Sequence, residues 1–292
     1  MFMPDLLKEK RILITGGGTG LGRAMAERFL QLGAAVYICG RRAEVVEQTA
    51  GELARIGSGQ ISGFGCDVRD MASVEAMLDA IWSEGPLNVL VNNAAGNILA
   101  RTEDLSLRAW EAVVGIVLNG TINMTVACGR RWLAARQSAT VLNVSTTYAA
   151  SGSGSAYVVP SAVAKAGVMA LTRSLAVEWG PRGIRLNGIA PGPIPTEGAF
   201  SRLLPSKDFE ELAKGRNPVR RFGTTEEFAN VAAFLVSDGC TYINGEIVVM
   251  DGGEWLQGAG EFSYVGQQLT EEQWEAMRPK KKAPTSNSPR LP

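Results

Sequence analysis

The sequence predicts one α/β domain in which a doubly wound, seven-stranded parallel sheet is flanked by helices. Three features of the chain carry this prediction. Short apolar runs alternate with stretches that repeat apolar residues every three or four positions. The runs are apolar at successive residues, as expected for strands that are buried on both faces of a parallel sheet. A glycine-rich turn follows the first run directly, where such a sheet passes from its first strand into its first helix.

The predicted strands are the apolar runs at residues 11–15, 35–40, 61–68, 88–92, 139–145, 184–190 and 246–250. Helical apolar spacing covers residues 21–32, 43–56, 72–82, 107–135, 161–179 and 225–236. Repeated alternation of strand and helix indicates a Rossmann-type fold with crossover connections. A chain of 292 residues is within the size of one such domain, so we expect residues 1–278 to form a single domain.

Two stretches interrupt this alternation. Residues 191–218 contain several prolines and glycines and follow a predicted strand, so we expect a substrate loop there. Residues 279–292 combine three consecutive lysines with Pro, Ser and Asn and offer almost nothing to bury. We expect this end of the chain to be a disordered tail.

The composition argues against several classes of function. The 29 basic and 29 acidic residues balance, so no overall charge favours nucleic acid or an anionic membrane. We find no apolar run that predicts a membrane span and no signal-peptide pattern at the start, so we expect a cytoplasmic protein. The four cysteines are far apart in sequence, which predicts reduced, mostly buried thiols and no metal site. Histidine is absent, so catalysis must use other side chains.

The glycine-rich turn at residues 15–22 predicts a phosphate-binding site. Its glycines permit positive φ and a close approach of the backbone to a pyrophosphate, and the helix that follows supplies free N–H donors. An ordinary glycine-rich turn is the alternative, but the order of strand, turn, helix and second strand favours a dinucleotide. The residues assigned to the phosphates are Gly16, Thr19, Gly20, Leu21 and Gly22.

The end of the second predicted strand indicates which nicotinamide nucleotide is preferred, because the adenosine ribose lies there. An acidic residue at this position favours NAD. This chain has Arg41 and Arg42 instead, and guanidinium groups match a 2′-phosphate in charge and geometry. We therefore expect NADPH as the cofactor. The alternative is that both arginines are solvated surface charges.

Several segments together resemble the short-chain dehydrogenase/reductase family over about residues 10–253. They are the glycine turn, residues 66–68 and 92–96, Asn119, Ser145, Lys165 and residues 191–192. The resemblance implies that Asp67 contacts adenine, that residues 191–194 pass the nicotinamide and that Thr196 meets its carboxamide. It implies a homotetramer as well. The additional cofactor contacts implied in this way are Asp67, Val68, Asn93, Lys165, Pro191, Gly192, Ile194 and Thr196.

One position departs from the family pattern. The usual proton donor is a tyrosine four residues before the lysine, whereas Ser161 stands there in this chain. A serine hydroxyl is far less acidic than a phenol, so Ser161 does not simply replace it. The 2,4-dienoyl-CoA reductases of the family share this departure, and this chain resembles them at residues 92–97, 117–121, 158–161, 198–202, 260–262 and 271–274.

The resemblance to dienoyl-CoA reductases implies an acyl-CoA thioester as substrate and an upstream tyrosine as the hydroxyl donor. Tyr148 is our choice, and Tyr157 is the rival because it too precedes Lys165. In the implied mechanism a hydride from NADPH reaches the δ-carbon of the dienoyl chain, and the α-carbon is protonated to leave a 3-enoyl-CoA. The residues implied in catalysis are Tyr148, Lys165, Asn97, Asn119 and Ser161, and those implied in substrate binding are Asn97, Tyr148, Phe200 and Arg202.

Two alternatives stay open at the level of sequence. One is an enoyl-CoA or carbonyl reductase of the same family, which acts on a different acyl or carbonyl substrate. The other is a protein that binds the dinucleotide but is catalytically silent, since the usual tyrosine is absent. The presence of Lys165, Asn119 and Asn97 argues against the silent protein.

Overall fold

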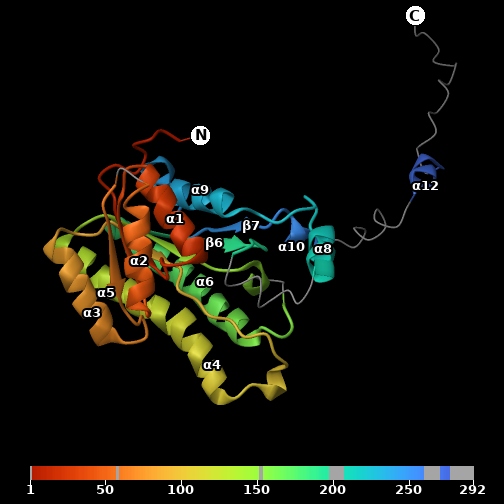
Figure 1. Ribbon diagram of the computed structural model, residues 1–292, viewed down its shortest axis with the longest axis horizontal. Helices are drawn as coiled ribbons and strands as arrows, with labels where there is room; N and C mark the ends of the chain where they lie inside the picture. Colours follow the sequence, from red (N-terminus) through yellow and green to blue (C-terminus); the bar gives the residue numbers. More distant parts are fainter. Residues whose placement is uncertain (1, 57–58, 151–153, 197–206, 260–269, 277–292) are drawn as a thin grey trace, which may run out of the picture. The chain divides into compact units, whose positions relative to one another are not determined.

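The computed structural model contains the predicted seven-stranded parallel sheet with helices on both faces (Figure 1). It describes residues 2–56, 59–150, 154–196, 207–259 and 270–276. The strands are β1 (Arg11–Thr15), β2 (Ala35–Gly40), β3 (Ile61–Gly65), β4 (Val89–Asn92), β5 (Ala139–Val144), β6 (Ile184–Pro191) and β7 (Ile247–Met250). The chain divides into two units, Met1–Trp255 and Leu256–Pro292, and the whole sheet belongs to the first.

The strand order is β3-β2-β1-β4-β5-β6-β7, and every neighbouring pair is parallel. The chain therefore builds outward from β1 to β3 and then crosses back to place β4 on the other side of β1. Loops that follow β1 and β4 leave the sheet in opposite directions at this point. A doubly wound sheet binds its ligand in the crevice that opens there, at the carboxyl ends of the strands.

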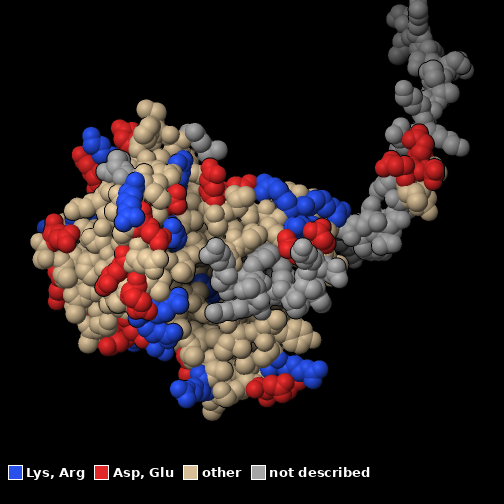
Figure 2. Space-filling model, in the orientation of Figure 1, with Lys and Arg blue, Asp and Glu red and all other residues tan. Residues whose placement is uncertain are grey.

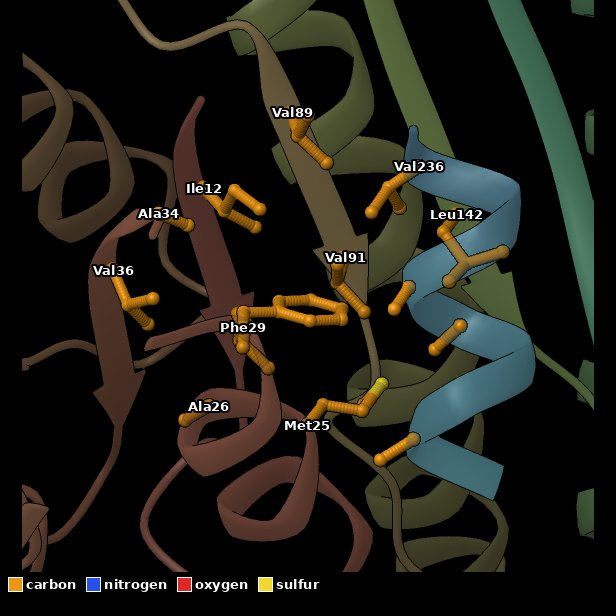
Figure 3. Close-up of a cluster of buried hydrophobic side chains, with 14 of the residues drawn as sticks. Ile12, Met25, Ala26, Phe29, Ala34, Val36, Val89, Val91, Leu142 and Val236 are labelled. Carbon is orange, nitrogen blue, oxygen red and sulfur yellow. The ribbon is translucent and has the colours of Figure 1, made fainter. Parts of the chain in front are cut away.

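Two apolar layers cover the sheet. Helices α1 (Gly20–Gln31), α2 (Ala43–Leu53) and α9 (Thr225–Val236) pack on one face, and α3 (Met71–Ser83), α5 (Gly120–Ala135) and α6 (Val159–Trp179) pack on the other. Figure 3 shows the first layer, in which Phe29 of α1 lies between Ile12 of β1 and Val91 of β4. In β1 and β4 alternate residues enter the two layers, so these central strands are buried on both faces, as predicted.

Three predicted elements differ clearly from the structure. The helix predicted at residues 43–56 ends at Leu53. The third strand ends at Gly65 and not at residue 68, because β2 ends at Gly40 and leaves no partner beyond the bond from Cys66 N to Gly40 O. The single helix predicted at residues 107–135 is divided into α4 (Leu107–Val114), a π-helical turn (Gly115–Asn119) and α5. Gly120 explains the close packing beside this turn, since a Cβ there would lie 2.5 Å from the Val68 side chain.

The remaining described elements are α8 (Lys207–Arg216), α10 (Glu254–Ala259), α12 (Glu271–Ala276) and 3-10 turns at Thr102–Asp104, Thr147–Ala149, Gly180–Arg182 and Asp238–Cys240. Part of the expected substrate loop, residues 197–206, lies outside the described residues, as does the expected tail at residues 279–292. The expected domain end at residue 278 stays a prediction. All four cysteines are buried and free, as predicted from their spacing.

Residues Leu107–Ala135 form a helical run that is long and apolar enough to cross a membrane, although the sequence predicted no such run. Half of its most apolar window is buried inside this fold, where α5 packs on the sheet beside α3. Burial of this kind is also typical of a core helix in a globular domain. On the face in Figure 2, acidic and basic side chains are interspersed over the first unit.

Candidate active site

A cleft lies at the carboxyl ends of the strands near the crossing point between β1 and β4. Its walls come from the glycine turn after β1, the end of β2, the segment after β3 and the segment after β4. Arg41, Arg42, Asp67 and Val68 line it, together with Gly16 and Thr19 of the turn. Residues that are distant in the sequence thus meet around one cavity, as the sequence analysis expected of a dinucleotide site.

The glycine turn has the backbone conformation that its composition predicts. Gly16 and Gly20 have φ values of +65° and +55°, which favour glycine. A Cβ at Gly22 would lie 2.3 Å from the carbonyl oxygen of Gly16, so only glycine lets α1 approach the turn. Thr19 precedes α1 and makes no side-chain cap to it, and Leu21 stands in its first turn. The free N–H groups of this turn therefore suit an anionic group in the cleft.

Thr15 and Asn93 hold the turn against the segment that follows β4. The Thr15 hydroxyl accepts hydrogen bonds from the backbone N–H groups of Asn93 (3.0 Å) and Ala94 (2.9 Å). In return, Asn93 Nδ2 donates to the carbonyl oxygens of Thr15 (2.9 Å) and Gly16 (3.2 Å). No role was predicted for Thr15, although a threonine that ends a buried strand before a glycine turn is a usable signal.

Arg41 and Arg42 follow β2 at the rim of the cleft, and both are exposed. Neither guanidinium makes an ion pair within the part of the chain that the structure describes. Asp67, by contrast, is paired with Arg69, whose guanidinium lowers the pKa of the Asp67 carboxyl below its ordinary value. Arg69 also lines the cleft and was missed by the sequence analysis, although its spacing from Asp67 was visible.

A second group of polar side chains gathers where β5 ends and α6 begins. Tyr148 belongs to the 3-10 turn after β5, and Ser161 lies in the first turn of α6. Their hydroxyl oxygens are 3.0 Å apart, within hydrogen-bond distance. Asn97, from the segment after β4, donates through Nδ2 to the Tyr148 hydroxyl at 3.4 Å. Three candidate residues from three segments are therefore in contact.

Lys165 lies one helical turn after Ser161, and only 7% of it is exposed. Its ammonium group donates to the carbonyl oxygen of Val144 at the end of β5. Burial lowers the pKa of Lys165 from 10.5 to about 8. Ser145 follows Val144 in the chain, and its hydroxyl is buried with no hydrogen-bond partner among the described residues. A lysine and an unpaired hydroxyl at a strand end suit a polar ligand in the adjoining cleft.

Tyr157 does not join this group. It is 56% exposed and has a φ of 68°, and its backbone oxygen accepts from Ala100 N. Asn119 ends the π-helical turn, where it is exposed and makes no side-chain hydrogen bond to the described residues. The implied link between Asn119 and Lys165 stays a prediction. Exposure gives the Asn119 amide access to water, so this amide does not require a protein partner.

The segment after β6 faces the glycine turn. Gly192 N donates to Met250 O at 3.0 Å, which fixes the chain directly after the end of β6 at Pro191. Ile194 is buried in the core. A Cβ at Gly20 would lie 3.6 Å from the Thr196 side chain, so Thr196 and the turn are neighbours. Phe200 and Arg202, which the resemblance implies in substrate binding, lie outside the described residues.

A buried polar ladder supports the floor of the site beneath these segments. Asn92 Nδ2 donates to Thr125 Oγ1 and to Asn143 Oδ1, both at 2.9 Å. Asn143 Nδ2 donates in turn to Thr172 Oγ1 of α6 at 2.8 Å. The ladder joins β4, β5, α5 and α6, so it fixes the strand ends relative to the helix that carries Ser161 and Lys165.

Comparison with known proteins identifies similar sequences over most of the chain. A family model described as Enoyl-(Acyl carrier protein) reductase matches residues 16–254. A probable 2,4-dienoyl-CoA reductase of Bacillus subtilis (strain 168), named as (2E)-enoyl-CoA-producing, is 45% identical over 86% of this chain and 98% of that protein. Probable 2,4-dienoyl-CoA reductase 3 of Caenorhabditis elegans, named as (3E)-enoyl-CoA-producing, is 45% identical over 85% of this chain and 81% of that protein.

Solved structures show the same architecture. A short chain dehydrogenase from Bacillus anthracis str. 'Ames Ancestor' has a TM-score of 0.78 and 41% identity, covering 85% of this chain and 97% of that one. A gluconate 5-dehydrogenase from Burkholderia cenocepacia J2315, in complex with NADP and tartrate, has a TM-score of 0.79 and 28% identity. It covers 86% of this chain and 97% of that one. The range that the family model matches, residues 16–254, includes the glycine turn and the group formed by Asn97, Tyr148 and Ser161.

The lowered pKa of Lys165 makes stability depend on pH in a defined direction. Between pH 8 and 10.5 the unfolded chain holds this proton and the folded protein has released it, so stability increases with pH. We expect the free energy of unfolding of the wild type to increase over this range relative to Lys165→Met by up to about 3 kcal/mol. Urea unfolding of both proteins at matched pH values measures the difference. If the difference in free energy of unfolding between the two proteins did not change with pH over this range, burial of a titrating Lys165 would be contradicted.

Proposed function

The chain belongs to the short-chain dehydrogenase/reductase family, and on this premise we propose that it reduces 2,4-dienoyl-CoA thioesters to 3-enoyl-CoA with NADPH. The group formed by Tyr148, Ser161 and Asn97 is the observation that carries the proposal. Ser161 occupies the position of the usual tyrosine, and the structure brings the phenol of Tyr148 to it from another segment. Relatives named as 2,4-dienoyl-CoA reductases, at 45% identity, support the same substrate class.

The cleft suits a dinucleotide cofactor, and we propose NADP as the preferred one. Gly16 and Gly20 have positive φ values and carry no side chain, so the backbone of the turn is accessible where the phosphates would lie. Arg41 and Arg42 stand at the rim without ion pairs to the described residues, so both guanidinium groups are available to a 2′-phosphate. When bound, NADPH supplies a hydride. The NADP complex of a structural neighbour supports this choice.

Tyr148 would act on the carbonyl oxygen of the thioester. Asn97 donates to the Tyr148 oxygen, and Ser161 can donate to it as well, which leaves the phenol proton free for the substrate. Hydride arrival at the δ-carbon moves negative charge along the conjugated chain to the carbonyl oxygen. A hydrogen bond directed at that oxygen stabilises the dienolate that results.

Lys165 would hold the nicotinamide ribose and keep the local potential positive. Its bond to Val144 O and its position one turn after Ser161 fix the ammonium group beside the same strand end. The α-carbon is bonded directly to the carbonyl carbon, whereas the γ-carbon is two bonds further along the chain. A proton delivered through Tyr148, or through a water that it orients, therefore favours the α-carbon. This choice gives the 3-enoyl product, and protonation at the γ-carbon would give a 2-enoyl product.

A second candidate substrate is a 2-enoyl thioester, because the matching family model is described as an Enoyl-(Acyl carrier protein) reductase. Such a reaction places the hydride on the β-carbon instead of the δ-carbon. The same hydrogen-bond donors would stabilise the enolate, so the polar group at Tyr148 does not distinguish the two reactions. Relative turnover of the two thioesters separates these reactions.

We propose a homotetramer as the assembled form. Leu107 on α4 and Val163 and Val177 on α6 are large apolar side chains that this single chain leaves exposed. Their burial against further copies would remove apolar area from water. Size-exclusion chromatography with light scattering should give four times the mass of the chain, and a monomer would reject the proposal.

The proposed reaction is tested by comparing three thioesters with each nicotinamide nucleotide. We expect kcat/KM for a 2,4-dienoyl-CoA with NADPH to exceed that for a 2-enoyl-CoA or a 3-ketoacyl-CoA by about tenfold or more, because the conjugated chain spreads the developing charge. NADH should be the poorer donor. Preference for the 2-enoyl-CoA would favour the second candidate, and NADPH binding without turnover would indicate a catalytically silent protein.

Tyr148→Phe tests the proposed hydroxyl donor. We expect kcat to decrease by about a hundredfold or more, as for loss of one donor to a developing oxyanion, with NADPH affinity nearly unchanged. Tyr157→Phe tests the rival tyrosine, and Tyr242→Phe is a matched control at a fully exposed position. Unaltered turnover in Tyr148→Phe, or a large loss in Tyr157→Phe alone, would contradict the assignment.

A further inference from the structure

Asp67 and Arg69 form a two-pronged ion pair in the wall of the cleft. Arg69 Nε donates to Asp67 Oδ1 at 2.9 Å and to Oδ2 at 3.1 Å, and Arg69 Nη2 donates to Oδ2 at 2.5 Å. The backbone N–H of Arg69 adds a fourth bond, to Oδ1 at 3.1 Å. Both oxygens of the carboxylate are therefore held by a single residue that lies two positions further along the chain.

Arg69 is itself held from a second direction. Asn123 of α5 donates through Nδ2 to the carbonyl oxygens of Val68 (3.0 Å) and Arg69 (3.3 Å), which fixes the backbone. The aliphatic part of the Arg69 side chain packs against Gly115 of the π-helical turn. A Cβ placed at Gly115 would lie 3.5 Å from the Cδ of Arg69. The guanidinium thus has a supported position and is not a freely moving surface charge.

The pair determines what the carboxylate can bind. Arg69 lowers the pKa of Asp67, so the group is ionised at neutral pH and can only accept hydrogen bonds. A carboxylate has about four lone-pair directions, and the bonds from Arg69 occupy most of them. Asp67 lines the cleft, so the acceptor capacity that Arg69 leaves is held there in a fixed orientation. A ligand group that donates fits this position, and a ligand group that only accepts is repelled.

The position of the pair indicates which part of the ligand it meets. It follows β3, beyond the Arg41 and Arg42 segment at the end of β2, on the side of the glycine turn away from Tyr148 and Lys165. In a doubly wound fold the base of a dinucleotide lies on this side. Adenine carries an amino group that donates, whereas hypoxanthine carries an oxo group at the same ring position.

We propose that Arg69 is a positioning residue that fixes Asp67 as an oriented acceptor, so that the protein selects an adenine dinucleotide over one with an oxo base. This inference rests on the proposed cofactor and adds a determinant of base specificity to it. A purely structural pair is the competing explanation. Partly exposed ion pairs contribute little to stability, so a structural role gives a weak effect that is equal for both bases.

The experiment measures dissociation constants for NADPH and for reduced nicotinamide hypoxanthine dinucleotide phosphate, by quenching of protein fluorescence. We expect the wild type to bind NADPH at least about tenfold more tightly, since the oxo group leaves the Asp67 acceptor unpaired. Arg69→Gln should reduce this preference to about threefold or less, and Arg69→Lys should restore part of it. Because the readout is a ratio, a uniform loss of affinity from altered charge or altered folding cancels.

Two variants serve as controls for this ratio. Arg55→Gln removes the same charge at an exposed position near the end of α2 and should leave the ratio unchanged. Arg41→Gln should alter the preference for NADPH over NADH. It should leave unchanged the base ratio, which is the ratio of the dissociation constants for the hypoxanthine and adenine dinucleotides. An unchanged base ratio in Arg69→Gln, with both dinucleotides still bound, would overturn the positioning role. Failure of the wild type to bind either dinucleotide would overturn the cofactor proposal and this inference with it.

Discussion

The hydrogen bonds between Thr15 and Asn93 are the constraint on which the site depends. They join the ends of β1 and β4. These strands are neighbours at the point where the strand order in the sheet changes direction. These hydrogen bonds tie the glycine turn to the segment that carries Asn97. The Thr15 hydroxyl accepts hydrogen bonds from two backbone N–H groups of the segment after β4. Thr15 is buried, so water does not replace this acceptor, and the bonds hold the two halves of the cleft together.

The catalytic part of the cleft depends on a second set of buried bonds. The ladder from Asn92 through Asn143 to Thr172 joins the sheet to α6, and α6 carries both Ser161 and Lys165 toward the end of β5. Each bond in it is worth little alone, but leaving one of these buried amides unpaired would cost more than the bond contributes. Polar groups at the floor therefore fix the geometry while the apolar layers supply most of the stability.

Much of the architecture could be predicted because it depends on local patterns. Short apolar runs between helical patterns identified the sheet, and glycines before α1 identified the phosphate turn. The four-residue spacing placed Ser161 beside Lys165. The π-helical turn could not be predicted, since periodicity across residues 107–135 does not show where Gly120 packs against Val68. The end of β3 depends on where β2 stops, and the role of Arg69 depends on a rotamer. These are tertiary contacts that a linear pattern does not contain.

The central claim is that this site transfers a hydride to the δ-carbon of a conjugated thioester. The most direct measurement uses a 2,4-dienoyl-CoA with NADPH that carries deuterium at the transferred position, in ordinary water, followed by NMR spectroscopy of the product. We expect one deuterium at the δ-carbon, a solvent proton at the α-carbon and a double bond between the β- and γ-carbons. A product with no deuterium at the δ-carbon would contradict it.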